Sequence, residues 1–153
     1  VTLRDTSVDT IIEMSGGYPY FIQFVCKEVY DAVIQKIDAG EAPNIPVAAI
    51  QRKLDSDFFA GRWARVTDRQ RELLAVIASL ENCDTEFTVQ EVVEGSKSLE
   101  TKGFSSSHAN QMLAKLGRDG LVFKNRHGKY SFAVPLLGQF INRQMAVDQT
   151  GPA

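Results

Sequence analysis

Between Ser105 and Tyr130 the sequence gathers side chains that can bind an anionic polymer. This stretch holds five basic residues and a single acidic one, Asp119, so its net charge is +4. Lysine and arginine pair with phosphate, and short polar side chains can contact either phosphates or base edges. These residue types predict nucleic-acid contact through eight side chains: Ser106, Ser107, Asn110, Gln111, Lys115, Arg118, Lys124 and Arg126.

The rest of the chain carries no such excess of positive charge. The first 67 residues hold seven basic and nine acidic side chains, and the whole chain has a net charge of −2. Bulk electrostatics therefore do not predict a polyanion binder, and any nucleic-acid contact must come from the local patch. A charge of +4 is modest, so an ordinary solvated helix face remains the alternative interpretation of these residues.

The cysteines and histidines of the chain do not form a metal-binding pattern. Cys26 and Cys83 lie far apart, no CxxC pair occurs, and the only histidines are His108 and His127. Structural zinc sites need four such ligands at short spacings. We therefore expect no metal site, reduced cysteines, and histidines at the surface that can donate to phosphate.

Helix and strand signals around the basic stretch predict the elements that position it. Thr67 is a helix N-cap before the apolar-periodic segment 68–81, and Phe87 and Thr88 form a short strand-like entry to a second helix. A third helix is predicted at 105–120, with serine caps at its start and Gly120 as its terminator. Two alternating runs at 121–134 predict a β-hairpin, and Pro135 opens a closing helix over 135–147. Helix, strand, helix, helix, hairpin is the order of a winged helix domain.

The N-terminal part predicts three helices. Ser7 is the expected N-cap of a helix at 7–14 with an apolar stripe of Val8, Ile11 and Ile12, and Gly16 and Gly17 stop it. Pro19 starts a second helix that runs to Asp38 and is apolar on most of its surface, so other parts must cover it.

A third helix is predicted from Pro46 to the Asp57-Phe58-Phe59 cluster. The segment 58–68 is interpreted as a junction, where Gly61 permits a bend and Trp63 is a large buried anchor.

The predicted class is mainly α, with a helical lid subdomain at 1–66, a winged helix-turn-helix domain with a small β-hairpin wing at 67–147, and a disordered tail at 148–153. No apolar run reaches membrane-spanning length and no signal peptide is visible, so we expect a cytoplasmic protein.

Three segments together resemble a known family. SGGYPYFIQFVCKEVYD (15–31) resembles the lid of archaeal and bacterial AAA-type ATPases of the STAND and origin-recognition-like groups. DFFAGRWARVTDRQRELL (57–74) and YSFAVPLLGQFINRQ (130–144) look like the tail of the same family. The resemblance covers the chain from about Ser7 to Gln144. It implies that the chain is the C-terminal portion of a larger ATPase.

The family's lid carries a Gly-x-Pro motif whose proline packs near the bound nucleotide. Gly17, Tyr18 and Pro19 match this motif, so the resemblance implies that they lie near ATP or ADP with magnesium in the longer protein. No arginine stands near Pro19, where many AAA relatives place a nucleotide-sensing arginine, and this departure favours the STAND-like arrangement. The chain has no GxxxxGK[ST] phosphate-binding loop, so we expect no ATPase activity from it alone.

Three functions stay open at this point. The leading expectation is a lid and winged helix that contacts DNA under the control of its own N-terminal ATPase core. An alternative is a winged helix that serves as a protein-interaction or oligomerisation module of a signalling ATPase, and an uncovered apolar helix would favour such self-association. A stand-alone transcription regulator fits less well, because the first 60 residues resemble a lid.

Overall fold

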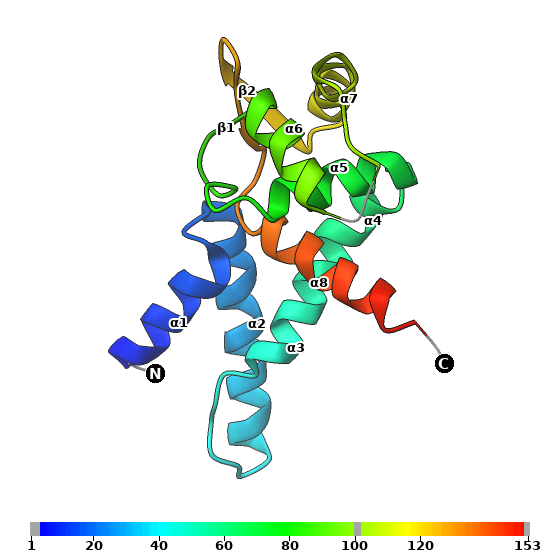
Figure 1. Ribbon diagram of the computed structural model, residues 1–153. Helices are drawn as coiled ribbons and strands as arrows, with labels where there is room; N and C mark the ends of the chain where they lie inside the picture. Colours follow the sequence, from blue (N-terminus) through cyan, green and yellow to red (C-terminus); the bar gives the residue numbers. More distant parts are fainter. Residues whose placement is uncertain (1–3, 100–101, 152–153) are drawn as a thin grey trace. The chain divides into compact units, whose positions relative to one another are not determined.

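The computed structural model describes residues 4–99 and 102–151. The described part is mainly α: seven helices make it 65% helical, and a small three-stranded antiparallel sheet lies toward the C-terminus. This confirms the predicted mainly α class with a small sheet (Figure 1). The chain divides into two compact units, Val1–Gly61 and Arg62–Ala153, whereas the sequence suggests a division after residue 66. Within the described ranges, no helix is both long and apolar enough to cross a membrane.

The first unit is built from helices α1, α2 and α3, which pack in sequence order. Its core is a cluster of buried aliphatic side chains from all three helices, extended by partly buried neighbours such as Phe24 and Val33. The helices span Asp5–Ser15 (α1), Pro19–Asp38 (α2) and Val47–Leu54 (α3). The buried cluster comprises Ile11, Val25, Val29 and Ile50.

The turn between α1 and α2 forms as predicted. Gly16 and Gly17 both have positive φ, of 58° and 70°, and the Gly17 N–H donates to the Ile12 carbonyl, which closes the helix end. Pro19 occupies the first position of α2.

One prediction about α1 is wrong, and its apolar stripe is only partly buried. The helix begins at Asp5, so Ser7 is inside it and is not its N-cap. Only Ile11 of the predicted stripe is buried, because Val8 and Ile12 are 41% and 52% exposed.

A second correction concerns the predicted junction at 58–68. The helix that starts with α3 does not stop at Phe59: it passes through a π-helical turn, η1 (Asp55–Phe59), and continues as α4 (Ala60–Trp63). The π turn accompanies the burial of Phe59, whose ring lies 5.8 Å from that of Phe21. Trp63 is buried as predicted, with its ring 6.1 Å from that of Phe140.

The second unit packs four longer helices with a small sheet. Helix α5 contacts α6, α7 and α8, and the sheet order is β1-β3-β2. Fully buried leucine, isoleucine and phenylalanine side chains from α5, α7 and α8 form its core. The elements span Asp68–Ala78 (α5), Phe87–Thr88 (β1), Val89–Ser98 (α6), Ser106–Arg118 (α7), Val122–Arg126 (β2), Lys129–Phe132 (β3) and Leu137–Gln149 (α8).

The helix caps and the hairpin predicted for this unit are confirmed. Thr67 caps α5 as predicted, through a reciprocal capping box with Gln70. Thr88, which the sequence predicts only as part of a strand-like entry, caps α6 in the same way with Glu91. Ser105 caps α7, and β2 and β3 pair as an antiparallel hairpin.

The closing helix differs from its prediction. Helix α8 starts at Leu137, two residues after Pro135, and Leu136 before it has a positive φ of 68°. The helix also includes Asp148 and Gln149, so the prediction that the disordered tail starts at residue 148 is wrong. The end of that predicted tail, residues 152–153, lies outside the described residues.

Candidate nucleic-acid interface

Helix α7 presents one apolar and one polar face. Met112, Leu113 and Leu116 are buried, as predicted from their spacing. All six of the predicted contact residues on this helix are exposed: Ser106, Ser107, Asn110, Gln111, Lys115 and Arg118. The polar face of α7 is therefore open to solvent and available to a ligand.

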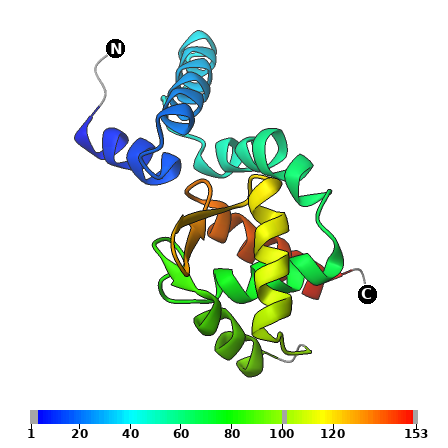
Figure 2. The same ribbon diagram turned by 90° about the horizontal axis from the view of Figure 1, so that it is seen from above.

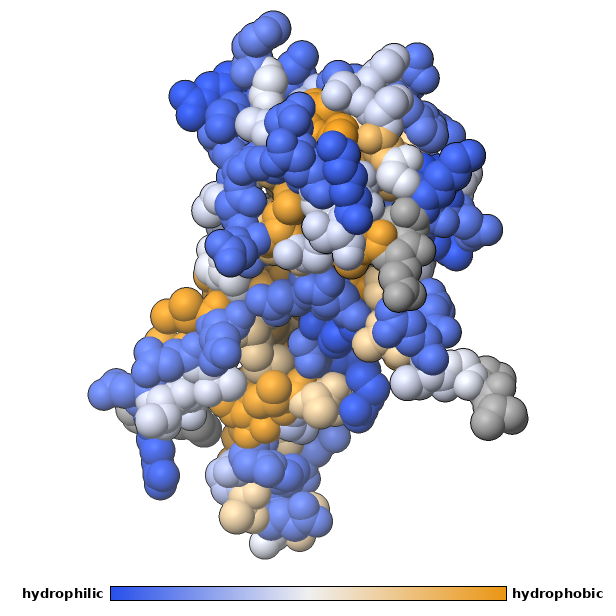
Figure 3. Space-filling view, viewed as in Figure 1, coloured by the Kyte–Doolittle hydropathy of each residue, from blue (hydrophilic) through white to orange (hydrophobic). Residues whose placement is uncertain are grey.

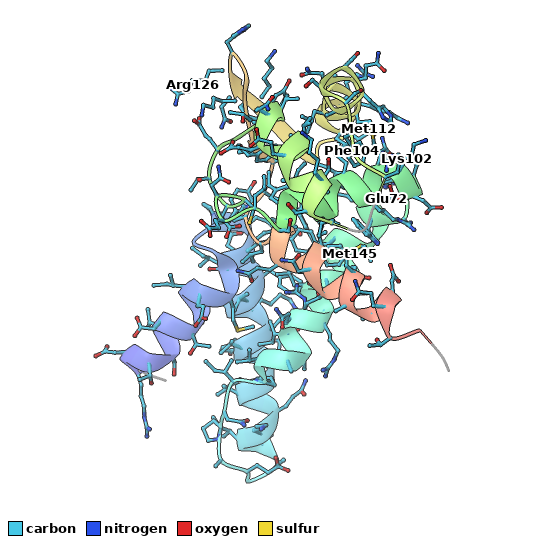
Figure 4. The ribbon with its side chains drawn as sticks, in the orientation of Figure 1. Glu72, Lys102, Phe104, Met112, Arg126 and Met145 are labelled. Atoms are coloured by element: carbon cyan, nitrogen blue, oxygen red, sulfur yellow. The ribbon has the colours of Figure 1, made fainter. Side chains whose placement is uncertain are left out.

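The loop that leads into α7 is held in place by Arg69 of α5. The Arg69 guanidinium lies over the Phe104 ring, 3.7 Å from its centroid, and its Nη2 donates to the carbonyls of Lys102 and Gly103 at 2.6 and 3.0 Å. Arg69 also pairs with Glu72, and Figure 4 marks Phe104, Lys102 and Glu72 in this region. The buried Ser96 Oγ accepts the Phe104 N–H at 3.1 Å. These contacts hold the loop directly before Ser105, the N-cap residue of α7.

A pocket of about 430 Å³ lies between the start of α7, the start of α6 and the hairpin. Figure 2 shows α7 and the hairpin side by side, and α7 packs on β2. None of the nine lining residues is acidic. They are Thr88, Val89, Gln90, Ser106, Asn110, Lys124, His127, Gly128 and Tyr130.

Strand register explains which hairpin residues face this pocket. Lys124 pairs with Tyr130, and Tyr130 with Phe87, so these three side chains share one face of the sheet. Phe87 and Tyr130 are buried there, which leaves Lys124 at the edge of the core, in the pocket. A register irregularity between Lys124 and Arg126 breaks the alternation before the turn.

Arg126 instead binds a carboxylate that the sequence pattern did not predict. Its Nη2 lies 2.9 Å from Glu86 Oε2, and the Asn125 side-chain amide donates to Glu86 Oε1 at 3.1 Å. The hydrogen bond from Arg126 holds the pKa of Glu86 below its ordinary value of 4.5. Glu86 lies outside the stretch 105–130, and its position directly before a strand gives no signal of this pairing.

Glu91 further reduces the positive charge near the hairpin. Its carboxylate accepts the Thr88 N–H at 2.6 Å and the Thr88 hydroxyl at 2.9 Å. These hydrogen bonds lower its pKa, and the charge of Lys129 lowers it further. The net charge of +4 counted along the sequence therefore overstates the positive charge of the folded surface.

The predicted contact residues divide into four groups. Ser106, Asn110 and Lys124 line the same pocket. Lys115 and Arg118 are exposed in the last turn of α7, and within the described ranges neither they nor Lys124 has a carboxylate partner at ion-pair distance. Ser107 and Gln111 are exposed on α7 outside the pocket, and Arg126 is held by Glu86.

The surface over α7 and the hairpin is mostly polar. Figure 3 shows mostly hydrophilic side chains over α7 and the hairpin, and hydrophobic side chains gathered on part of the helical unit 1–61. One exception on the hairpin is Phe123 of β2, which is 60% exposed.

Gly17, Tyr18 and Pro19, the predicted nucleotide-proximal residues, lie together in the α1–α2 turn. Tyr18 is the N-cap residue of α2 and is 38% exposed, and its ring contacts that of Phe21 edge-to-face at 5.1 Å. Tyr20, 55% exposed, lies beside Phe58 with their ring centroids 5.6 Å apart. The turn therefore presents an aromatic surface, and the proximity of these three residues to a nucleotide stays a prediction.

Comparison with known proteins gives one match. Residues 56–141 match a family model described as Domain of unknown function (DUF8462). No curated protein and no solved structure matches the chain significantly.

Proposed function

The chain belongs to this family of domains of unknown function, and we propose that its unit 62–153 is a winged helix that binds the phosphate backbone of DNA. Helix α7 would be the recognition helix and the β2–β3 hairpin the wing. The observation that carries the proposal is the pocket, in which Ser106 and Asn110 of α7 meet Lys124 and His127 of the hairpin and no carboxylate lines the wall. Such a set of donors suits a phosphodiester group.

We further propose that the unit 1–61 is the lid of a longer AAA- or STAND-type ATPase. The sequence resemblance is the basis, and the geometry of the α1–α2 turn is compatible with it: two glycines with positive φ followed by a proline at the helix start. Gly17, Tyr18 and Pro19 would then approach ATP or ADP with magnesium bound by an N-terminal core. DNA contact would be under the control of that core.

Binding to DNA is tested by its dependence on salt. Fluorescence anisotropy with a labelled mixed-sequence duplex, repeated over a range of NaCl concentrations, gives the slope of log K against log [salt]. Each contacted phosphate contributes about −0.9 to this slope. Replacing Lys115, Arg118 and Lys124 by alanine should weaken binding and flatten the slope by up to about 2.7, because three cations are removed.

A matched variant controls for net charge. Lys27, Lys36 and Arg52 lie in the other unit and provide the same two lysines and one arginine. Alanine at these three positions should leave the slope unchanged. If both triple variants bind with the wild-type slope, α7 and the hairpin do not contact phosphate.

A protein-interaction role for the same unit is the second candidate. The observation in its favour is the large exposed side chain of Phe123, since exposed aromatic residues are enriched where proteins bind one another. The salt measurement separates the two functions, because a module that binds only protein shows no salt-dependent affinity for the duplex.

A further inference from the structure

The four residues Glu86, Asn125, Arg126 and Ser131 form a polar network on the hairpin. Glu86 accepts from Arg126 at 2.9 Å and from Asn125 at 3.1 Å, and Ser131 donates to Asn125 Oδ1 at 3.2 Å. Glu86 stands 40 positions before Arg126 in the chain. Its side chain keeps 34% exposure and that of Arg126 keeps 71%, so this is a solvated ion pair that a competing anion can reach.

The network separates the two cations of strand β2. Lys124 lines the pocket together with Ser106 and Asn110, whereas Arg126 is not among the lining residues. Arg126 directly precedes the turn at His127 and Gly128, and both of these turn residues line the pocket. The residue thus adjoins the pocket along the chain, while its guanidinium is paired with the Glu86 carboxylate.

We propose that Glu86 is an internal counter-ion that competes with nucleic-acid phosphate for Arg126 and so limits the affinity of this surface. The inference rests on the proposed function. The Glu86 carboxylate neutralises the Arg126 charge and occupies its Nη2 donor, so a phosphate that approaches Arg126 meets a paired cation beside a negative charge. In the wild-type protein the duplex therefore gains little from Arg126.

The competition has an expected size. Exposed ion pairs are weak, so release of Arg126 should raise duplex affinity by about two- to fivefold at low salt. One additional phosphate contact should make the slope of log K against log [salt] more negative by about 0.9. A purely structural role for Glu86 would change the melting temperature but would not steepen the slope.

The test uses the same anisotropy assay on the full chain. Glu86→Gln removes the charge and keeps a side-chain oxygen for Asn125, and it should bind more tightly with a steeper slope. Arg126→Ala alone should leave the slope nearly unchanged, and adding Arg126→Ala to Glu86→Gln should return the slope to the wild-type value. Glu86→Asp keeps the charge but shortens the reach toward Arg126, so it should shift affinity in the same direction as Glu86→Gln. Glu81→Gln removes one exposed carboxylate close in sequence and should have no effect on the slope.

The results separate failure of this role of Glu86 from failure of DNA binding itself. If wild-type protein binds with a salt slope and Glu86→Gln has the same slope, the role of Glu86 is refuted while the proposed DNA contact stands. An equal gain in duplex affinity from Glu81→Gln would also refute the role of Glu86, since the change in net charge alone would then explain the tighter binding. Absence of salt-dependent binding by the wild type and by every variant overturns both proposals.

Discussion

At the scale of single residues, Leu136 is the most unusual position in the described chain. It is the one residue other than glycine, within the described ranges, whose φ is positive, and at 68° it lies in the left-handed region. In that region the Cβ atom lies too close to the following carbonyl oxygen, and this steric clash costs roughly 1–2 kcal/mol per residue. Leu136 directly precedes α8, whose first residue Leu137 is buried and which packs against α5.

Comparing Leu136→Gly with Leu136→Ala isolates this backbone effect. Both variants lose the same partly buried side chain, but only alanine keeps a Cβ. We expect the glycine variant to be more stable than the alanine variant by about 1 kcal/mol, the reverse of their usual order. Chemical denaturation of the two proteins measures the difference, and a more stable alanine variant would show that Leu136 is unstrained.

At the scale of elements, the position of α7 depends on the loop before it. Arg69 of α5 binds two loop carbonyls and stacks on Phe104, and Ser96 of α6 accepts the Phe104 N–H. Three helices thus meet at one loop. Because the polar residues Ser106 and Asn110 follow directly on α7, this loop also sets where they stand relative to the hairpin.

Arg69→Met should therefore affect both stability and binding. Methionine keeps the apolar stem and loses the hydrogen bonds and the cation–π contact, at a cost of about 1–2 kcal/mol in unfolding free energy. Duplex affinity should fall while the salt slope stays constant, because Arg69 is occupied by the loop and is not a phosphate ligand. Arg65→Met removes the same charge from an exposed side chain and should change neither stability nor affinity. A flatter slope in Arg69→Met would assign Arg69 to the interface itself.

At the scale of the whole molecule, the two units differ in how they should respond to acid. Within the described ranges, the glutamates with a lowered pKa are Glu86 and Glu91, and both belong to the unit 62–153. A carboxyl group whose folded pKa is below its unfolded value stabilises the fold above the unfolded pKa, which is 4.5 here. This stability is lost as the pH falls from 4.5 through the lower, folded pKa.

The unit 62–153 should consequently lose stability on acidification. Thermal unfolding followed by circular dichroism should show a melting temperature that falls between about pH 5 and about pH 3. Glu91→Gln should be less stable than wild type at neutral pH, and this difference should shrink as the pH falls, since wild-type Glu91 is then also uncharged. The exposed Glu81→Gln variant should follow the wild-type pH dependence, and a constant difference for Glu91→Gln would contradict the role of the Glu91 carboxylate.

Features that depend on neighbouring residues could be predicted from the chain alone. Thr67, Ser105 and Gly120 act through hydrogen bonds and φ angles within four residues, so their local pattern predicts helix ends in unit 62–153 correctly. The same reasoning predicts the hairpin and includes Ser106, Asn110 and Lys124 in one candidate site. The N-cap predicted at Ser7 is wrong, because the helix begins earlier, at Asp5.

Features that depend on distant residues became visible only in the folded molecule. The helix continues through Gly61, next to Phe59, which packs on Phe21, and the positive φ of Leu136 occurs where α8 begins and packs on α5. Arg126 is paired with Glu86, which no local pattern relates to it. These contacts join residues about 40 or more positions apart, and their energies depend on sheet pairing and core packing rather than on local sequence. The charge of the candidate interface is therefore set by the fold, although the residues that compose it can be identified from the chain.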